Sequence, residues 1–195
     1  MKKILFVVSL FLIPFCGFSQ TTKPIDGFLG VKFGSNKLTV IAALKAKGAT
    51  FDKNSSDAGN LTFRNATLAH RSVHGLIVKF VNNKACQAVF IFNPDVEAKI
   101  IEEYKDLTTD ISRAYGEGQA TNNYKYPYKD GEELSDTLVG LSAGKIDMST
   151  VWFDAKKNAI GIEITTDMTI DLKYEDSKLM DEAIAKQDAK DKADL

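Results

Sequence analysis

Apolar residues repeat with helical spacing in two stretches of the chain, and a glycine follows each stretch. The first stretch has four residues on one helical face: Leu38, Ile41, Ala42 and Leu44. Ser35 precedes it as an N-cap whose hydroxyl can accept from a free backbone N–H, and Gly48 suits the left-handed position that ends many helices. The pattern predicts a helix over residues 36–47.

The second stretch carries the clearest helical pattern in the chain. Its apolar residues are spaced 4, 4, 3, 4 and 4 apart: Val96, Ile100, Tyr104, Leu107, Ile111 and Tyr115. Charged residues occupy the other side. With Asn93 as cap, Pro94 at the first helical position and Gly116 as the stop, the sequence predicts a helix over residues 94–115.

The remaining apolar runs alternate or are rich in β-branched and aromatic residues, which is typical of strands. Residues 75–92, "GLIVKFVNNKACQAVFIF", predict a hairpin that turns at Asn82 and Asn83. Residues 149–165, "STVWFDAKKNAIGIEIT", predict a second hairpin inside a strand-rich region from 124 to 172. We therefore expect an α+β fold in which an antiparallel sheet carries the two helices on one face.

The order of these elements indicates an internal duplication. Both halves run from a helix through a glycine and polar strands to a hairpin, and residues 78–92 can be overlaid on 151–165 at a constant offset. This predicts two tandem helix–sheet units, 20–92 and 93–175. Residues 176–195 follow as a short helix that frays into a polar tail, "KQDAKDKADL", which we expect to be partly disordered.

The amino terminus has the layout of a secretory signal peptide. Two lysines precede a short apolar run, and Gly17 and Ser19 supply small residues before a cut ahead of Gln20. Residues 1–19 are therefore expected to be removed on export to the periplasm or the outside of the cell. An uncleaved membrane anchor and a lipidated Cys16 are the alternatives, but the run is short for a membrane span and bulky Phe15 does not suit lipidation.

Composition and charge narrow the function classes. The chain has 195 residues, of which 44% are hydrophobic, enough to build a core. Its 25 Lys and Arg balance 26 Asp and Glu, and no basic cluster is interleaved with aromatic residues. We therefore expect no nucleic-acid partner. After signal removal Cys86 would be the only cysteine; it lies in a strand-like run and is expected to be a small buried residue without a disulfide.

The helix start at Gly34-Ser35, the "VIAALKAKG" that follows, and the hairpin with its Asn turn together resemble the β-lactamase-inhibitor-protein-like superfamily. They are also similar to the small outer-membrane-assembly lipoproteins that share its helix–sheet repeat. The resemblance implies a non-enzymatic module that binds proteins through its sheet or loops, and it supplies no catalytic residues. The chain departs from those lipoproteins at Cys16, which does not lie in a good lipobox.

The segment "YKYPYKDGEE" is the candidate binding surface in the sequence. Tyr124, Tyr126 and Tyr128 alternate, so they would point to one side if the segment were extended. Tyrosines on one face can bind a sugar, a peptide or a partner protein. The competing interpretation is that they pack over the hydrophobic edge of the sheet, and Pro127 places the segment at an edge or in a loop.

Two other residue pairs could suggest metal binding or catalysis, but their signals are weaker. His70 and His74 would be about 13 Å apart on a strand, too far to share a metal ion. Ser142 and Lys145 match a Ser-x-x-Lys spacing, but Gly144 interrupts it and partner motifs are missing. We expect no catalytic residues, metal or cofactor.

The sequence therefore favours a binding or envelope-assembly protein whose partner is another envelope or extracellular protein. A small-ligand carrier and a hydrolase without a recognisable motif are the alternatives.

Overall fold

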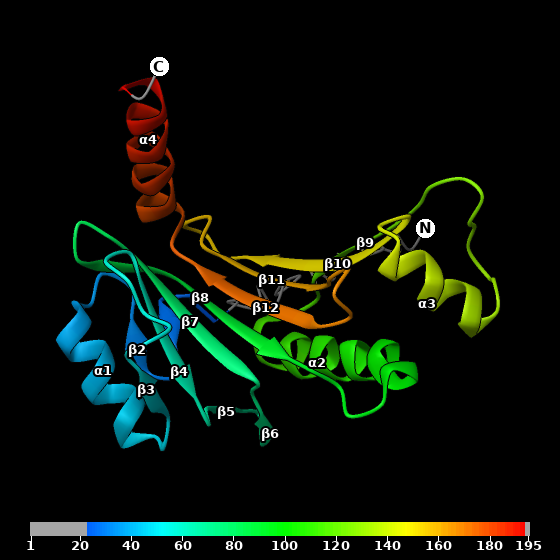
Figure 1. Ribbon diagram of the computed structural model, residues 1–195, viewed down its shortest axis with the longest axis horizontal. Helices are drawn as coiled ribbons and strands as arrows, with labels where there is room; N and C mark the ends of the chain where they lie inside the picture. The colour runs from blue at the N-terminus through cyan, green and yellow to red at the C-terminus, as the bar shows by residue number, and fades with distance from the viewer. Residues whose placement is uncertain (1–22, 194–195) are drawn as a thin grey trace, which may run out of the picture.

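The computed structural model describes residues 23–193 and has an α+β fold built on a large antiparallel sheet (Figure 1). Eight strands hydrogen-bond in the order β3-β4-β7-β8-β12-β11-β10-β9. The expected fold class is confirmed. The predicted signal peptide over 1–19, which includes Cys16, and the last two residues of the predicted tail lie outside the described residues.

Each half of the chain contributes four neighbouring strands to this sheet. From the first half come β3 (Thr50–Asp52), β4 (Asn60–Arg64), β7 (Gly75–Val81) and β8 (Lys84–Phe92). From the second come β9 (Gln119–Tyr124), β10 (Ile146–Phe153), β11 (Ala159–Ile164) and β12 (Ile170–Glu175). The halves meet where β8 pairs with β12. Two small ribbons lie outside the sheet: β1 (Gly27–Phe28) with β2 (Val31–Lys32), and β5 (Thr67–Leu68) with β6 (Arg71–Ser72).

The helices divide between the two faces of the sheet. Helices α1 (Lys37–Ala46) and α2 (Ile100–Tyr115) lie on one face, as expected. Helix α4 (Ser177–Ala193) stands on the other face, against β7 and β8, and α3 (Leu134–Ser142) lies beside β10 at the far end. A 3-10 turn, η1 (Glu97–Lys99), precedes α2.

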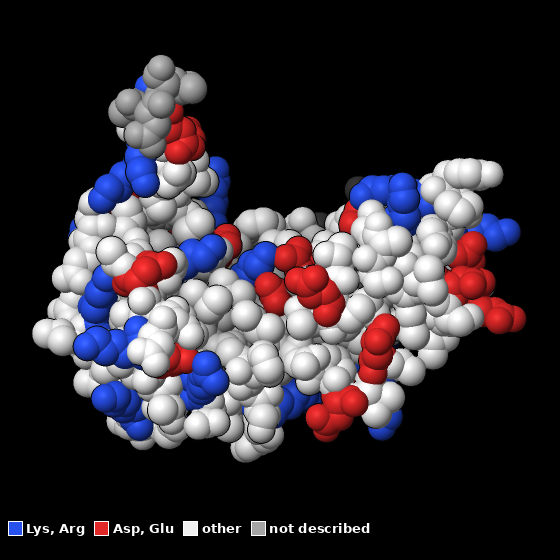
Figure 2. All heavy atoms as spheres, viewed as in Figure 1, with Lys and Arg blue, Asp and Glu red and all other residues white. Residues whose placement is uncertain are grey.

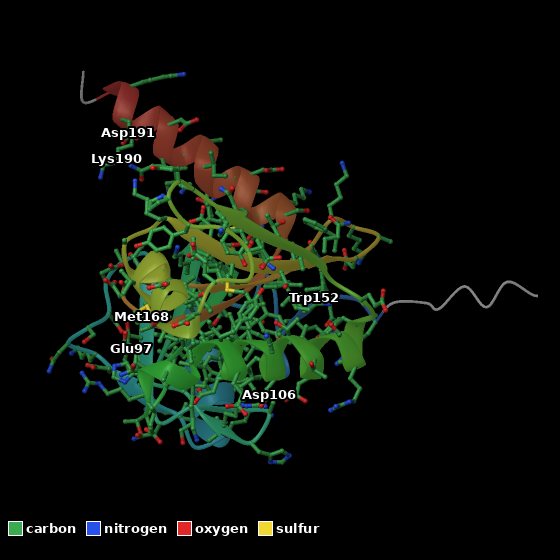
Figure 3. All side chains as sticks on the ribbon, turned by 90° about the vertical axis from the view of Figure 1, so that its right-hand side faces the viewer. Glu97, Asp106, Trp152, Met168, Lys190 and Asp191 are labelled. Atoms are coloured by element: carbon green, nitrogen blue, oxygen red, sulfur yellow. The ribbon has the colours of Figure 1, made fainter. Side chains whose placement is uncertain are left out.

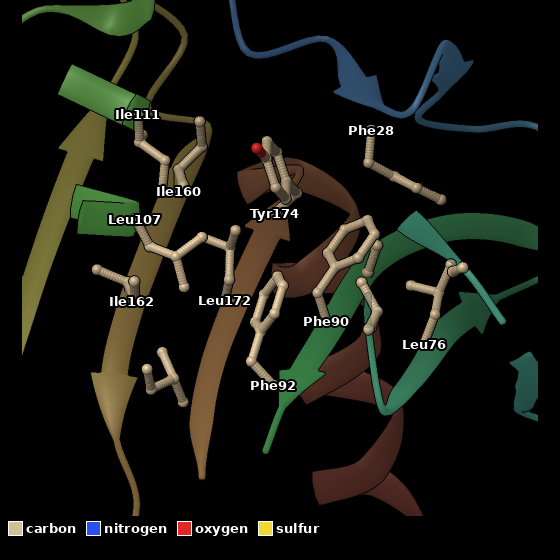
Figure 4. Close-up of a cluster of buried hydrophobic side chains, with 14 of the residues drawn as sticks. Phe28, Leu76, Phe90, Phe92, Leu107, Ile111, Ile160, Ile162, Leu172 and Tyr174 are labelled. Atoms are coloured by element: carbon tan, nitrogen blue, oxygen red, sulfur yellow. The ribbon is translucent and has the colours of Figure 1, made fainter. Parts of the chain in front are cut away.

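Alternate side chains of the central strands build the core under α1 and α2, although on β8 residues of the other face are buried as well. On β8, Ala88, Phe90 and Phe92 point into this core, and Leu172 and Tyr174 do so on the neighbouring β12 (Figure 4). Helix α2 adds its buried residues Ile100, Tyr104, Leu107 and Ile111. One apolar cluster runs through both halves, so the sheet and its two helices pack as a unit.

The predicted helix 36–47 is confirmed as α1, but two of its details are wrong. Asn36, rather than Ser35, is the N-cap, and its side-chain oxygen accepts from the Thr39 N–H at 3.0 Å. Ser35 is instead held by β8, because its carbonyl accepts from the Ala85 N–H. Val40 and Leu44 are the buried pair one turn apart, which leaves Leu38 on the outer side with 80% of its surface exposed.

The predicted buried face of the second helix is confirmed, but its start is wrong. Asn93 and Pro94 do not cap α2, because the chain first leaves β8, forms η1 and only then enters the helix at Ile100. Val96 is half exposed and does not reach the core. The end is as predicted: Gly116 follows Tyr115 with a positive φ of 88°.

Both predicted hairpins are present. Asn82 and Asn83 turn between β7 and β8 with φ of 49° and 61°, the left-handed values that suit a two-residue hairpin loop. The β10–β11 hairpin turns over residues 154–158, where Lys157 has a positive φ. Helix α3 was not expected in this strand-rich half, since Thr137, Val139 and Gly140 all weaken the helical signal.

The overlay of 78–92 on 151–165 does not match the positions of the strands. It places β7–β8 on β10–β11, whereas reading inward from each edge of the sheet pairs β7–β8 with β11–β12. Amphipathic hairpins share one alternating pattern, so they overlay readily without occupying equivalent places. The division into units 20–92 and 93–175 stays a prediction.

The polar tail after residue 185 does not fray within the described residues, because α4 continues to Ala193. Its first turn is capped by Asp176, whose carboxylate accepts from the Leu179 N–H at 2.8 Å. Leu179 and Met180 pack on Val81 and Cys86, and the rest of the helix projects from the sheet. Within residues 23–193 no helix is both long and apolar enough to cross a membrane.

Candidate binding surface

The three tyrosines of "YKYPYKDGEE" do not share one face in the structure. Strand β9 ends at Tyr124, and the chain then turns, so the extended geometry needed for a common face is absent. Tyr124 and Tyr128 are half buried against the core, and the Tyr124 hydroxyl donates to Asp130 at 3.1 Å. Tyr126 alone points outward, with 93% of its surface exposed. A part for these residues in binding stays a prediction.

The segments that contain His70 and Ser142 also adopt backbone conformations that differ from those considered for the sequence. His70 stands in the turn of the β5–β6 ribbon, so it is not on one extended strand with His74, as the distance argument had assumed. Ser142 is the last residue of α3, whereas a catalytic serine of that motif would open a helix. No group of three or more His, Cys, Asp or Glu that could hold a metal ion occurs in the described part of the chain.

Cys86 is buried as predicted, and Trp152 has a structural role as well. Cys86 is 1% exposed at the irregularity where β7 and β8 shift register, and burial raises the pKa of its thiol. Trp152 is buried on the side of the sheet that faces α2 (Figure 3). Its indole N–H donates to the Gly116 carbonyl at 2.9 Å, which ties β10 to the end of α2.

Over β12, β11 and β10, the face of the sheet opposite α1 and α2 is partly exposed, whereas Gln87 and Val89 on the adjoining β8 are buried. We call the part of this face on β8, β12, β11 and β10 the open face. It consists of the side chains that alternate with the core residues: Gln87, Val89, Ile91, Asp171, Lys173, Glu175, Ala159, Gly161, Glu163, Ser149, Val151 and Phe153. In Figure 1 it lies between α4 at one end and α3 at the other.

The open face is hollowed, and charged side chains gather in it (Figure 2). Gly161 lies in its middle, and a Cβ atom added there would meet nothing within 4 Å. On β10, Val151 is opposite this glycine, and Phe153, two residues further along the strand, keeps 55% of its surface exposed. The surface thus combines a recessed backbone, an exposed aromatic ring and charges, which are features of sites that bind another molecule.

Acidic groups outnumber basic ones at the centre of the open face. Lys173 pairs with Glu163 at 2.5 Å and its charge also acts on Asp171, while Glu175, two residues further along β12, accepts a hydrogen bond from Gln87. Asp171 is directly opposite Glu163 in the sheet register. Burial raises the pKa of Asp171, and the charge of Glu163 adds to this, while Lys173 counteracts it. Like charges directly opposite each other destabilise a sheet, so this arrangement carries a cost in the free protein.

One further polar group on this face lacks a partner. The Gln87 side chain is 4% exposed and its amide N–H donates to Glu175. Its carbonyl oxygen is buried and has no hydrogen-bond partner among the described residues. A buried acceptor without a donor costs stability.

The sequence of β12 contains a signal for this face, although it matches no catalytic or binding motif. In "IDLKYE", Ile170, Leu172 and Tyr174 alternate with Asp171, Lys173 and Glu175. Such alternation predicts one buried and one exposed face for β12. The cross-strand neighbours that turn these charges into a cluster come from strands distant in sequence, and no local pattern reveals them.

Comparison with known proteins identifies no relative of this chain. No protein-family model matches the chain, and neither a curated protein nor a solved structure does so. The resemblance to the β-lactamase-inhibitor-protein-like superfamily therefore rests on the Gly34-Ser35 helix start, the segment that follows it and the hairpin at Asn82 and Asn83.

Proposed function

We propose that this chain is an exported, non-enzymatic module that binds a partner protein on its open face. The observation that carries the proposal is that the open face holds three carboxylates, Glu163, Asp171 and Glu175, and that its lysine pairs with Glu163 alone. Export is supported by the signal-peptide pattern of residues 1–19.

The charges define the partner's chemistry. With three carboxylates and one ammonium group, the centre of the face attracts a basic side chain, and a cation beside Asp171 would relieve its repulsion with Glu163. Phe153 and the half-buried Val151 offer apolar contact next to these charges. The partner is therefore a protein that presents a lysine or arginine within an apolar surface.

A steric variant tests the proposal. Gly161→Trp places a large ring in the hollow, where the space around the glycine is open, so the fold is expected to tolerate it. Leu38→Trp is the matched control, because Leu38 is exposed on α1 beneath the opposite face. The proteins are used as bait for affinity capture from the native envelope.

We expect the wild-type protein and Leu38→Trp to recover the same partner, and Gly161→Trp to lose it. Equal recovery by Gly161→Trp, with its fold verified by circular dichroism, would show that the open face is not the binding surface.

A further inference from the structure

A cavity of about 540 Å³ lies on the helical side of the sheet, away from the open face. It is bounded by the β1–β2 ribbon and Lys47 from the first half of the chain, and by α2 and β12 from the second half. Its volume falls within the roughly 300–1,000 Å³ that is usual for small-molecule sites. The binding of a partner on the open face would leave it accessible.

The inner wall of the cavity is apolar and rigid. It is formed by buried side chains of the main core: Phe28, Leu107, Ile111, Leu172 and Tyr174. These residues belong to three elements, β1, α2 and β12, that share one buried core cluster. The wall is therefore preformed for the apolar part of a ligand.

One polar group interrupts this wall. Tyr174 is 7% exposed, and Figure 4 shows its hydroxyl turned away from β12, toward the space beside β1 and α2. No residue within 23–193 forms a hydrogen bond with this hydroxyl. Burial raises its pKa far above the usual value, with a smaller contribution from Tyr115, so the group remains an O–H donor at neutral pH.

The rim of the cavity is basic. Lys23, Lys32 and Lys47 line it, and all three are exposed. Lys23 lies 5.0 Å from the centre of the Tyr115 ring, and none of the three forms an ion pair within the described part of the chain.

Acidic groups at the rim do not cancel this charge. Asp110 is engaged by two arginines, with Arg71 at 2.5 Å and Arg113 at 3.0 Å. That leaves Asp26 against the three lysines. The potential at the mouth therefore favours an anion.

We propose that this cavity binds a small amphiphile with one anionic group, such as a carboxylate on a hydrocarbon body. The hydrocarbon packs on Leu107, Ile111 and Leu172. The anion lies toward the lysines, and the Tyr174 hydroxyl donates a hydrogen bond to an oxygen of the ligand.

Titration calorimetry on the whole chain with decanoate tests the proposal. Decan-1-ol has the same hydrocarbon without the charge, and decyltrimethylammonium reverses the charge. We expect decanoate to bind at one site, at least tenfold more tightly than decan-1-ol, and the cation to bind more weakly still. No binding of decanoate, or equal binding of all three, would overturn the proposal.

Two pairs of variants locate the site. Ala114→Trp fills the mouth from an exposed position on α2, and Ala185→Trp makes the same change on α4, outside the cavity. We expect at least a tenfold loss of decanoate affinity for Ala114→Trp and none for Ala185→Trp. An unchanged affinity of Ala114→Trp would show that decanoate binds elsewhere.

Charge is tested by changing Lys23, Lys32 and Lys47 together to Gln. The control changes three exposed lysines away from the cavity to Gln: Lys53, Lys99 and Lys129. We expect only the first variant to lose the preference for decanoate over decan-1-ol. The same loss in both variants would mean that net charge, and not this rim, selects the anion.

Discussion

Glu163 on β11 and Asp171 on β12 are direct cross-strand partners, so two carboxylates face each other at the centre of the open face. Lys173 pairs with Glu163 but has a single charge to share between them. This relationship underlies the proposed attraction of a basic partner, and it has a measurable consequence for stability.

Asp171→Asn is expected to stabilise the free protein at pH 7 by about 0.5 kcal/mol, the size of a cross-strand pair interaction. The pKa of Asp171 is raised in the folded protein, so its ionisation becomes unfavourable as the pH rises above the ordinary value of 3.8. The benefit of the substitution should therefore be present at neutral pH and vanish as the pH falls toward 3.8. Urea unfolding at several pH values measures it.

The control for this prediction is Asp188→Asn, at an exposed position on α4. It should leave the free energy of unfolding unchanged. A loss of stability at pH 7 on changing Asp171 would show that the carboxylate stabilises the free sheet and would argue against a repulsive pair.

The close contact of Gly118 with Trp152 predicts a second effect. A Cβ atom at Gly118 would lie 2.5 Å from Cε2 of Trp152 and 2.6 Å from Cγ2 of Thr150. Gly118→Ala should therefore cost about 1–3 kcal/mol of stability, as overpacking usually does. Gly161→Ala, where the added methyl meets nothing, should cost nothing. Chemical denaturation of both variants checks this, and equal effects would refute the packing argument.

The buried hydrogen bond between Tyr104 and Thr150 predicts a third effect. Their hydroxyl oxygens are 2.7 Å apart and join α2 to β10. Thr150→Val leaves the Tyr104 hydroxyl buried without this partner, which should cost about 1–3 kcal/mol. Adding Tyr104→Phe should recover part of the loss, because neither polar group then remains.

Thr109→Val on the exposed side of α2 is the control for that pair and should change stability by less than about 0.5 kcal/mol. If the double variant loses more free energy of unfolding than the two single variants lose together, the hydrogen bond is not the source of the effect.

The different burial of Tyr126 and Tyr128 predicts different effects on stability. Tyr128 is half buried against the core and lies close to Gly140 of α3, so Tyr128→Ala should lower stability by about 1–3 kcal/mol. Tyr126 is almost fully exposed, so Tyr126→Ala should leave stability within about 0.5 kcal/mol. Thermal unfolding measures both, and equal losses would contradict the placement of Tyr126.

Periodicity predicted most of the fold. The spacing of Ile100, Tyr104, Leu107 and Ile111 identified the buried face of α2, and the Asn82-Asn83 pair identified a hairpin, because both signals are local. Helix α3 was not predicted because it contains Gly140, a residue that weakens the helical signal. The helix packs closely at this glycine, where a side chain would collide with Ile146. That reason for a helical glycine appears only in the folded protein.

The candidate sites were less predictable. The sequence drew attention to Tyr124, Tyr126 and Tyr128 because they alternate, but a turn after β9 separates them. The Glu163–Asp171 pair depends on sheet register, and the cavity is lined by residues of both halves of the chain, such as Lys47 and Tyr174. Such contacts between distant residues leave no mark in a local pattern.

Photo-crosslinking at a single position tests the central claim, that the open face binds a partner protein. Benzoylphenylalanine replaces Phe153 on the open face in one protein and Leu38 on α1 in the other, two exposed apolar positions on opposite sides of the sheet. In the native envelope, the account predicts a discrete crosslinked protein from position 153, none from position 38, and loss of the former when Gly161→Trp is added. A crosslink from position 38 alone, or one from 153 that Gly161→Trp leaves unchanged, would contradict it.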